Sequence, residues 1–204
     1  MRSVFALALL TFTYPAFAAQ HDWPALFDVS DVAVDDVLNI RSRPDASSEI
    51  VGSLASNATG IEILWPDDQG KWGQVNAGES TGWVSLVFVT RQANQSDSNV
   101  PAVARCFGTE PFWSLDRKDG NLISSGLDRP TITYAISDTI TASGRIAPYA
   151  IRGESTDATI WLRFNRAECS DGMSDRLFAI DADVIIDGLA GSELLSGCCT
   201  LSVN

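Results

Sequence analysis

The four cysteines constrain the fold of this chain more than any other feature, because they can close it covalently. They stand at Cys106, Cys169, Cys198 and Cys199, all in the second half of 204 residues. An even set in an exported protein predicts two disulfides. A bond between the adjacent Cys198 and Cys199 would close a strained ring, so we expect Cys106 and Cys169 each to bond one of them. Adjacent residues on a strand point to opposite faces, which predicts one bridge inside the domain and one outside.

The start of the chain predicts export. Arg2 supplies a positive charge, residues 4–14 are apolar apart from threonine, and Ala16-Phe17-Ala18 has the form of a cleavage site. This pattern is typical of a secretory signal peptide over 1–18, cleaved near Ala18, and it is too short for a spanning helix. The alternative is that the segment stays attached as an anchor. No later stretch is apolar enough to span a bilayer, so we expect a periplasmic or secreted protein without a transmembrane anchor.

The charge and the metal-binding residue types exclude several classes of partner. The formal net charge is −12, which argues against nucleic acid and anionic membrane surfaces. There is no C-x-x-C pattern, and the single histidine, His21, lies in the tail that follows the leader. Triads that use histidine therefore have no member in either domain. We expect no metal and no cofactor.

Residues 31–90 alternate short apolar runs with turn signals. The runs cover 32–34, 37–40, 50–54, 61–64, 71–75 and 82–89. Short strands at this spacing, without helical periodicity, predict a small all-β barrel. The sequences LNIRSRPDASSEIVGSL (38–54), GKWGQV (70–75) and TGWVSLVFV (81–89) resemble those of bacterial SH3-like (SH3b) domains. Arg43 stands where that family usually has glycine before Pro44, so it either stretches the turn or faces the ligand.

The resemblance implies a targeting module that binds peptides of the bacterial cell wall. A cleft for a peptide needs aromatic walls and a few polar groups, and the candidates for these roles are Asn39, Arg41, Arg43, Trp65, Trp72 and Trp83. The alternative interpretation is that Trp72 and Trp83 fill the core of the barrel. Many such modules also act as spacers.

Residues 91–104 are small and polar, as in a linker, and 105–204 form the expected second domain. Alternating apolar residues over 131–136, 159–164 and 178–186 predict an antiparallel sheet around one core. Hairpin signals stand at 118–121 and 187–188. We expect seven or eight strands, arranged as a barrel or closed sandwich with disulfides.

Three motifs of the second domain resemble those of an uncharacterised bacterial envelope domain. They are CFGTEPFWSL (106–115), CSDGMSD (169–175) and SGCC (196–199). The resemblance implies kinship with that domain, which sometimes follows an SH3-like module. It implies no activity.

Two carboxylates are the candidates for catalysis. Glu110 lies beside aromatic residues, where a raised pKa would suit a general acid, and Asp171 or Asp175 could complete an acid–base pair. The structural alternatives are that Glu110 accepts backbone hydrogen bonds or pairs with Arg176, and that Trp113 plugs one end of the barrel. The loop Asp171–Asp175 is far short of a calcium-binding pattern and suits a tight turn.

The leading functional hypothesis is a non-enzymatic binding or adaptor protein for cell-wall peptide or an envelope partner. One alternative is a hydrolase-type enzyme with its site around Glu110 and Asp171. A second is a secreted inhibitor of lysozyme or a protease, which predicts an exposed acidic loop at 171–175.

Overall fold

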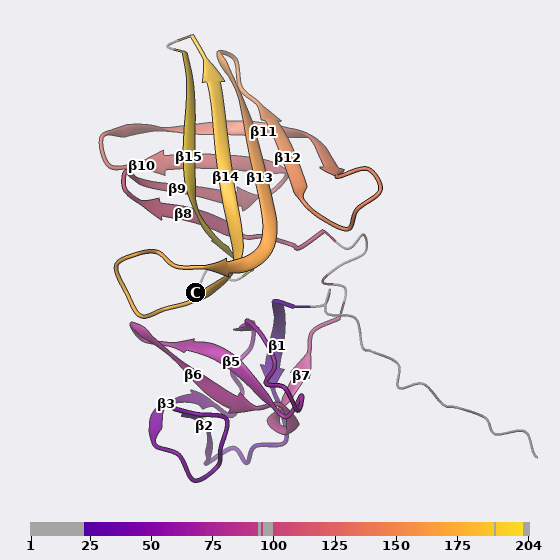
Figure 1. Ribbon diagram of the computed structural model, residues 1–204, viewed down its shortest axis with the longest axis vertical. Coiled ribbons are helices and arrows are strands. Elements are labelled where there is room, and N and C mark those ends of the chain that lie inside the picture. The colour runs from indigo at the N-terminus through magenta and orange to yellow at the C-terminus, as the bar shows by residue number, and fades with distance from the viewer. Residues whose placement is uncertain (1–22, 94, 96–99, 190, 202–204) are drawn as a thin grey trace, which may run out of the picture.

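The computed structural model describes residues 23–93, 95, 100–189 and 191–201, and the protein is all-β in these ranges. The expected signal peptide and His21 lie outside the described residues. Figure 1 shows two units stacked along the long axis of the molecule. No helical segment in the part of the chain that the structure describes has the length and apolar character of a membrane span.

The first unit is built from two small sheets. Its elements are β1 (Ala25–Val29), β2 (Val37–Arg41), β3 (Ile50–Ala55), β4 (Ile61–Ile63), β5 (Trp72–Ala77), β6 (Ser80–Ser85), the 3-10 turn η2 (Leu86–Phe88) and β7 (Val89–Arg91). One sheet has the order β4-β1-β7 and the other β3-β2-β6-β5. Alternate residues of these strands, among them Phe27, Ile40, Ile63 and Val84, form a common core.

Two segments of the first unit differ from the expectation. Residues 32–34 form no strand and belong to a loop instead. The strand β1 lies in the stretch assigned to a tail, and it pairs with both β4 and β7. Trp23 stacks on Phe27 with ring centroids 5.4 Å apart, so apolar residues before position 31 are part of this unit. The sequence did not predict β1, because a strand of five residues close to the leader gives too short an alternating pattern to recognise.

The second unit is a closed barrel of eight antiparallel strands, which agrees with the expected fold. The strands are β8 (Arg105–Thr109), β9 (Phe112–Lys118), β10 (Asn121–Gly126), β11 (Arg129–Thr141), β12 (Tyr149–Glu154), β13 (Ala158–Cys169), β14 (Phe178–Gly188) and β15 (Gly191–Thr200). The alternating residues of β13 and β14 point inward as expected, and Ile160, Leu162, Phe164, Ile180 and Val184 are all buried. Asp119 and Gly120 join β9 to β10 with positive φ angles of 48° and 75°, as in a two-residue hairpin turn.

The barrel closes where its last strand, β15, meets its first, β8. Only three residue pairs form this seam, and one of them is Cys199 opposite Cys106. These two cysteines are bonded to each other inside the core. Cys198 points to the other face and is bonded to Cys169, which is half-exposed. The disulfides therefore divide between the two faces of β15 as predicted, and the structure settles the connectivity that the sequence left open.

Glycines make room for Trp113 beside the seam. A Cβ atom on Gly108 would lie 2.3 Å from the Trp113 indole nitrogen, and one on Gly197 would lie 2.9 Å from Cζ2 of the same ring. Trp113 is buried within the barrel core. The glycines of the CFGTEPFW and SGCC motifs therefore let the indole lie against the strands that close the barrel.

The two units contact each other through side chains and backbone. The Asn76 amide nitrogen donates to the Leu177 carbonyl (2.9 Å), and Leu177 N–H donates to the Asn76 amide oxygen (3.2 Å). Asp175 N–H donates to the Glu79 carbonyl (2.9 Å). A carboxylate oxygen of Glu62 accepts from Leu201 N–H (3.1 Å). The loop after Cys169 therefore docks on the β5–β6 hairpin of the first unit.

Gly197→Ala should destabilise the barrel by roughly 1–3 kcal/mol, since overpacking a tight site forces the backbone to move. The added Cβ would lie 2.0 Å from the Phe107 carbonyl oxygen, across the seam. Urea unfolding of the mature protein measures the effect. Gly52→Ala is the control, because its Cβ would meet only ordinary contacts at 3.4 Å or more. Equal stability of the two variants would contradict the packing role of Gly197.

Removing either disulfide should lower the free energy of unfolding, and the seam bridge should matter more. The bridges span 93 residues for Cys106–Cys199 and 29 for Cys169–Cys198. In the chain-entropy model these separations correspond to about 4–5 and about 3–4 kcal/mol. The variants Cys106→Ala/Cys199→Ala and Cys169→Ala/Cys198→Ala, compared by urea unfolding, test this order. Larger destabilisation by the second pair would overturn it.

Candidate functional site

A pocket of about 330 Å³ opens on the first unit, beside β2 and β5. Asn39, Arg41 and Trp72 line it together with Phe88, Asp31 and Asp36. Asn39 and Arg41 alternate with the buried Leu38 and Ile40 along β2, so their side chains leave the core on the same face. The structure therefore brings together three of the six residues proposed from the sequence.

Asp67 fixes the position of Trp72 at the start of β5. One carboxylate oxygen of Asp67 accepts the backbone N–H groups of Lys71 (2.7 Å) and Trp72 (2.8 Å). Burial alone would raise the pKa of Asp67, but hydrogen bonds from the backbone amides of Trp72, Lys71 and Gln69 outweigh it and lower the pKa. The ionised carboxylate thus holds the turn that presents the indole.

Ser48 organises the loop that carries Arg41 and Arg43. Arg41 donates from Nη1 to the Ser48 carbonyl (2.8 Å). The Ser48 hydroxyl is buried and donates to the carbonyls of Arg43 (3.0 Å) and Asp45 (2.8 Å). Arg43 has no positive φ angle, is exposed, and does not line the pocket. The substitution of arginine for the usual glycine therefore leaves an ordinary backbone conformation, stabilised by Ser48.

The remaining two aromatic candidates lie outside the pocket. Trp83 is the Cα partner of Arg41 across β6 and β2, so it lies on the same outer face of the sheet. Trp65 precedes β5 and is half-buried. Neither Trp72 nor Trp83 belongs to the hydrophobic core, so the interpretation that they fill it is wrong.

Sequence reasoning missed the acidic side of the pocket. Asp31 and Asp36 flank residues 32–34, which were expected to form a strand and form a loop instead, and neither aspartate was a candidate from the sequence. The pocket is thus lined by the carboxylates of Asp31 and Asp36, the Arg41 guanidinium, and aromatic and aliphatic side chains. Such a site suits a small zwitterionic group, such as a peptide with both free amine and free carboxylate.

A cleft of about 620 Å³ lies between the units, beside the CFGTEPFW and CSDGMSD motifs of the second unit. Phe112, Trp113, Asp171, Met173 and Arg176 line it, with Glu79 from the first unit. Thr109 donates from its hydroxyl to the Asp171 carbonyl (2.7 Å), which joins the β8–β9 turn to the 171–175 loop. Glu110 is exposed and does not line the cleft.

Asp171 has the environment of a turn-forming carboxylate. Its two oxygens accept N–H groups of Met173 (3.0 Å) and Ser174 (2.9 Å) and the Ser174 hydroxyl (2.8 Å). Burial alone would raise the pKa of Asp171, but these hydrogen bonds, with Arg176 nearby, lower it. A lowered pKa favours the ionised form, whereas a general acid needs a raised pKa.

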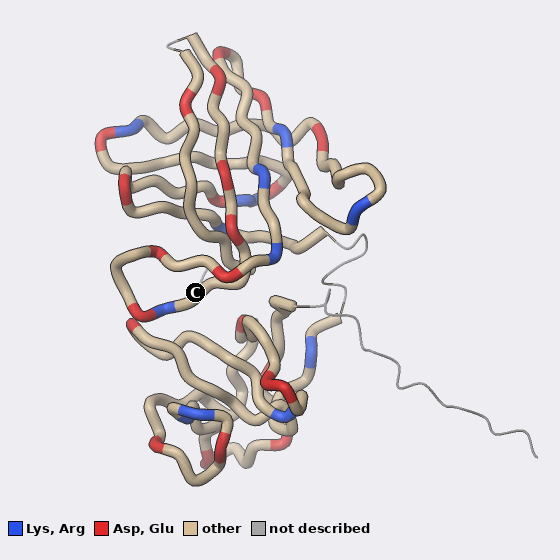
Figure 2. The backbone as a smooth tube through the Cα atoms, in the orientation of Figure 1, with Lys and Arg blue, Asp and Glu red and all other residues tan. Residues whose placement is uncertain are grey.

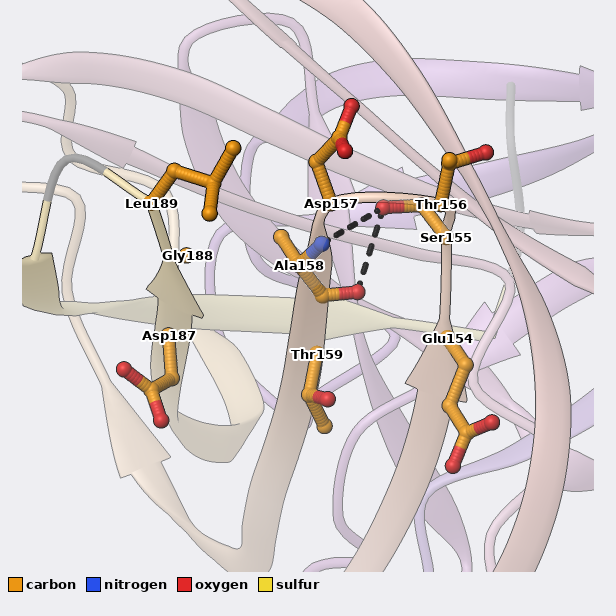
Figure 3. Close-up of a pocket in the computed structure, with 9 residues that line it drawn as sticks. All are labelled: Glu154, Ser155, Thr156, Asp157, Ala158, Thr159, Asp187, Gly188 and Leu189. Atoms are coloured by element: carbon orange, nitrogen blue, oxygen red, sulfur yellow. Dashed lines mark hydrogen bonds between the residues drawn. The ribbon is translucent and has the colours of Figure 1, made fainter.

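A third hollow, of about 460 Å³, lies between the β12–β13 turn and the end of β14. Figure 3 shows that the carboxylates of Glu154, Asp157 and Asp187 point away from one another. The Ser155 hydroxyl bonds with Ala158 at both its N–H and its carbonyl. Among the described residues, no group of three or more histidine, cysteine or acidic side chains is placed to hold a metal ion.

Comparison with known proteins gives one match. Residues 36–90 match the family model of the bacterial SH3 domain, and the pocket at Asn39, Arg41 and Trp72 lies mostly within this range. No curated protein and no solved structure matches the chain.

Asp171→Ala should destabilise the protein by roughly 1–2 kcal/mol at neutral pH, because two amides and a hydroxyl lose their acceptor. The pKa of Asp171 is lowered in the folded state, so its contribution is present above its ordinary value of 3.8. That contribution is lost as the pH falls through the folded pKa. Unfolding free energies of wild type and variant, measured between pH 7 and pH 2, should therefore converge at the acidic end.

Asp175→Ala is the matched control for this loop, since its bond to Glu79 uses the backbone N–H and survives the substitution. A pH-independent difference between wild type and Asp171→Ala would contradict the assigned role of the carboxylate.

Proposed function

We propose, from the bacterial SH3 domain at residues 36–90, that the protein is an exported envelope protein whose first unit binds cell-wall peptide. The proposal includes a signal peptide at 1–18, a periplasmic or secreted location, a binding domain over 31–90 to which β1 is added, a linker over 91–104 and a second domain over 105–204. Both disulfides support it, since such bonds persist in oxidising compartments outside the cytoplasm.

The observation that carries the binding site is the pocket at Asn39, Arg41 and Trp72. A wall peptide has a flexible backbone, free carboxylates and free amines. The Arg41 guanidinium would pair with a peptide carboxylate, and Asp31 or Asp36 with an amine. Trp72 and Phe88 would cover the intervening aliphatic part, and Asn39 would bond a peptide amide.

The rival functions find less support in the geometry. The 171–175 loop contacts the β5–β6 hairpin through Asp175 and Glu79, whereas an inhibitory loop would need to project freely. The enzyme hypothesis needs Glu110 and Asp171 at one site, but Glu110 is exposed and does not line the cleft of Asp171, whose carboxylate is occupied by its own turn. An adaptor that uses the first unit for attachment fits both observations.

Trp72→Ala should weaken binding of a synthetic stem peptide by about 10–100-fold, because truncating a central aromatic residue costs about 2 kcal/mol or more. Isothermal titration calorimetry with the mature protein measures this, beside retention on purified peptidoglycan. Arg41→Ala should weaken binding at low salt and reduce its salt dependence.

Trp65→Ala is the matched control, since it removes a half-buried tryptophan outside the pocket. Equal losses for Trp65→Ala and Trp72→Ala would place the site elsewhere. A wild-type protein that neither binds the peptide nor is retained on peptidoglycan would remove the wall-binding proposal.

A further inference from the structure

A cavity of about 310 Å³ lies in the second unit and shares Trp113 with the cleft between the units. Its walls are mainly apolar and come from facing strands: Trp113 and Leu115 on β9, Ile132 on β11, Val184 on β14 and Leu195 on β15. Barrels of eight strands are wide enough either for their own side chains or for one small ligand. The volume is at the lower end of the range for ligand sites, about 300–1,000 Å³.

The cavity extends from Trp113, beside the cleft between the units, toward the end of the barrel that is remote from the first unit. β14 starts at Phe178, directly after the loop that docks on the β5–β6 hairpin, and runs to Gly188. Ile186 lines the cavity from the far part of this strand. At about 3.3 Å per residue, Ile186 lies roughly 26 Å along the strand from Phe178. Figure 1 shows β14 and β15 extending away from the first unit to their connecting hairpin.

Tyr134 places a polar group in this mainly apolar surrounding. Ser114, Ser124 and Ser125 also line the cavity, and the Ser114 and Ser125 hydroxyls hydrogen-bond each other (2.8 Å). The residue is fully buried and lines the cavity, and its hydroxyl has no hydrogen-bond partner among the described residues. A buried tyrosine hydroxyl normally finds a partner, because leaving it without one costs free energy. The second buried tyrosine of the barrel follows this rule: the Tyr149 hydroxyl accepts a hydrogen bond from Arg166 Nη1 (2.6 Å).

An ion pair lines one side of the cavity. Arg129 donates to both carboxylate oxygens of Glu193, at 2.7 and 2.5 Å. Arg129 begins β11 and Glu193 belongs to β15, and these strands are not neighbours in the barrel. The pair therefore spans the space between two walls, and both side chains remain partly exposed. The Arg129 guanidinium is already paired with Glu193. A ligand carboxylate would therefore find no free cation there and would be repelled by the Glu193 carboxylate.

We propose that this cavity binds a small, uncharged, mainly apolar molecule with a single hydroxyl or carbonyl group. The apolar body fills the space between Trp113, Ile132 and Val184, and the polar group hydrogen-bonds the Tyr134 hydroxyl. The Arg129–Glu193 pair covers the entrance and disfavours anions. This site is independent of peptide binding by the first unit, and it gives the barrel a role of its own.

Three matched probes test the proposal on the mature full-length protein: 2-naphthol, naphthalene and 2-naphthoate. Methyl-labelled NMR locates each probe, and titration gives its affinity. We expect shifts at the methyl groups of Ile132, Val184, Ile186 and Leu195, with affinity highest for 2-naphthol. The neutral hydroxyl should improve affinity over naphthalene about fivefold, the usual effect of one hydrogen bond. The anion should bind weakest.

Tyr134→Phe should reduce the ratio of 2-naphthol to naphthalene affinity to near one, and its melting temperature should equal or exceed that of wild type. Tyr149→Phe is the matched control: it should leave the ratio unchanged and lower the melting temperature, because Arg166 loses its acceptor. Shifts confined to exposed methyls such as those of Leu189 and Leu194, or no shifts at all because the cavity takes only water, would overturn the proposal. So would an unchanged ratio in Tyr134→Phe.

Discussion

The adjacent cysteines near the end of β15 hold the second unit together from both faces of one strand. The strand alternation turns Cys199 into the barrel and Cys198 out of it, so two neighbouring residues reach two distant parts of the chain. The inner bond lies at the seam between β8 and β15, where only three residue pairs close the barrel. Strands β8 and β15 are far apart in the sequence and share few hydrogen bonds, so their pairing alone gains little free energy against the entropy of closing the chain. The covalent bond compensates for this entropy.

The outer bond anchors the start of a loop through which the two units meet. Cys169 ends β13, and the loop that follows it carries Asp171, Asp175 and Leu177 before β14 begins. Asp171 folds this loop internally, while Asp175 and Leu177 bond to the β5–β6 hairpin. Figure 2 shows acidic residues distributed over both units, so the contact does not bring together large patches of opposite charge. It depends instead on backbone groups held in place by local turns.

Much of the fold could be predicted from the sequence, because period-two patterning in β11, β13 and β14 is strong and one-sided. The glycine and aspartate at 119–120 likewise specify their turn. The short strand β1 could not be predicted, since its residues pair with β4 and β7, partners chosen by tertiary contact. The cysteine spacing allowed more than one connectivity, and only the register of β15 with β8 selects one of them.

The candidate site was predicted in part for similar reasons. Asn39, Arg41 and Trp72 follow from strand alternation and a family pattern, whereas Asp31 and Phe88 enter the pocket through a loop and a 3-10 turn that have no periodic signal. The cavity of the barrel has no sequence signature either. Tyr134 looks like an ordinary core residue on β11 until the contacts of its hydroxyl are counted.

The unequal burial of the two disulfides sets an order in which a reductant reaches them. Among the four cysteines only Cys169 is partly exposed, whereas its partner Cys198 and both residues of the seam bridge are almost fully buried. A small thiol therefore attacks the outer bond first. That step would release the start of the loop that touches the first unit, while the seam bridge and the contact between Glu62 and Leu201 persist. Mild reduction should therefore loosen the loop between the units before it opens the barrel.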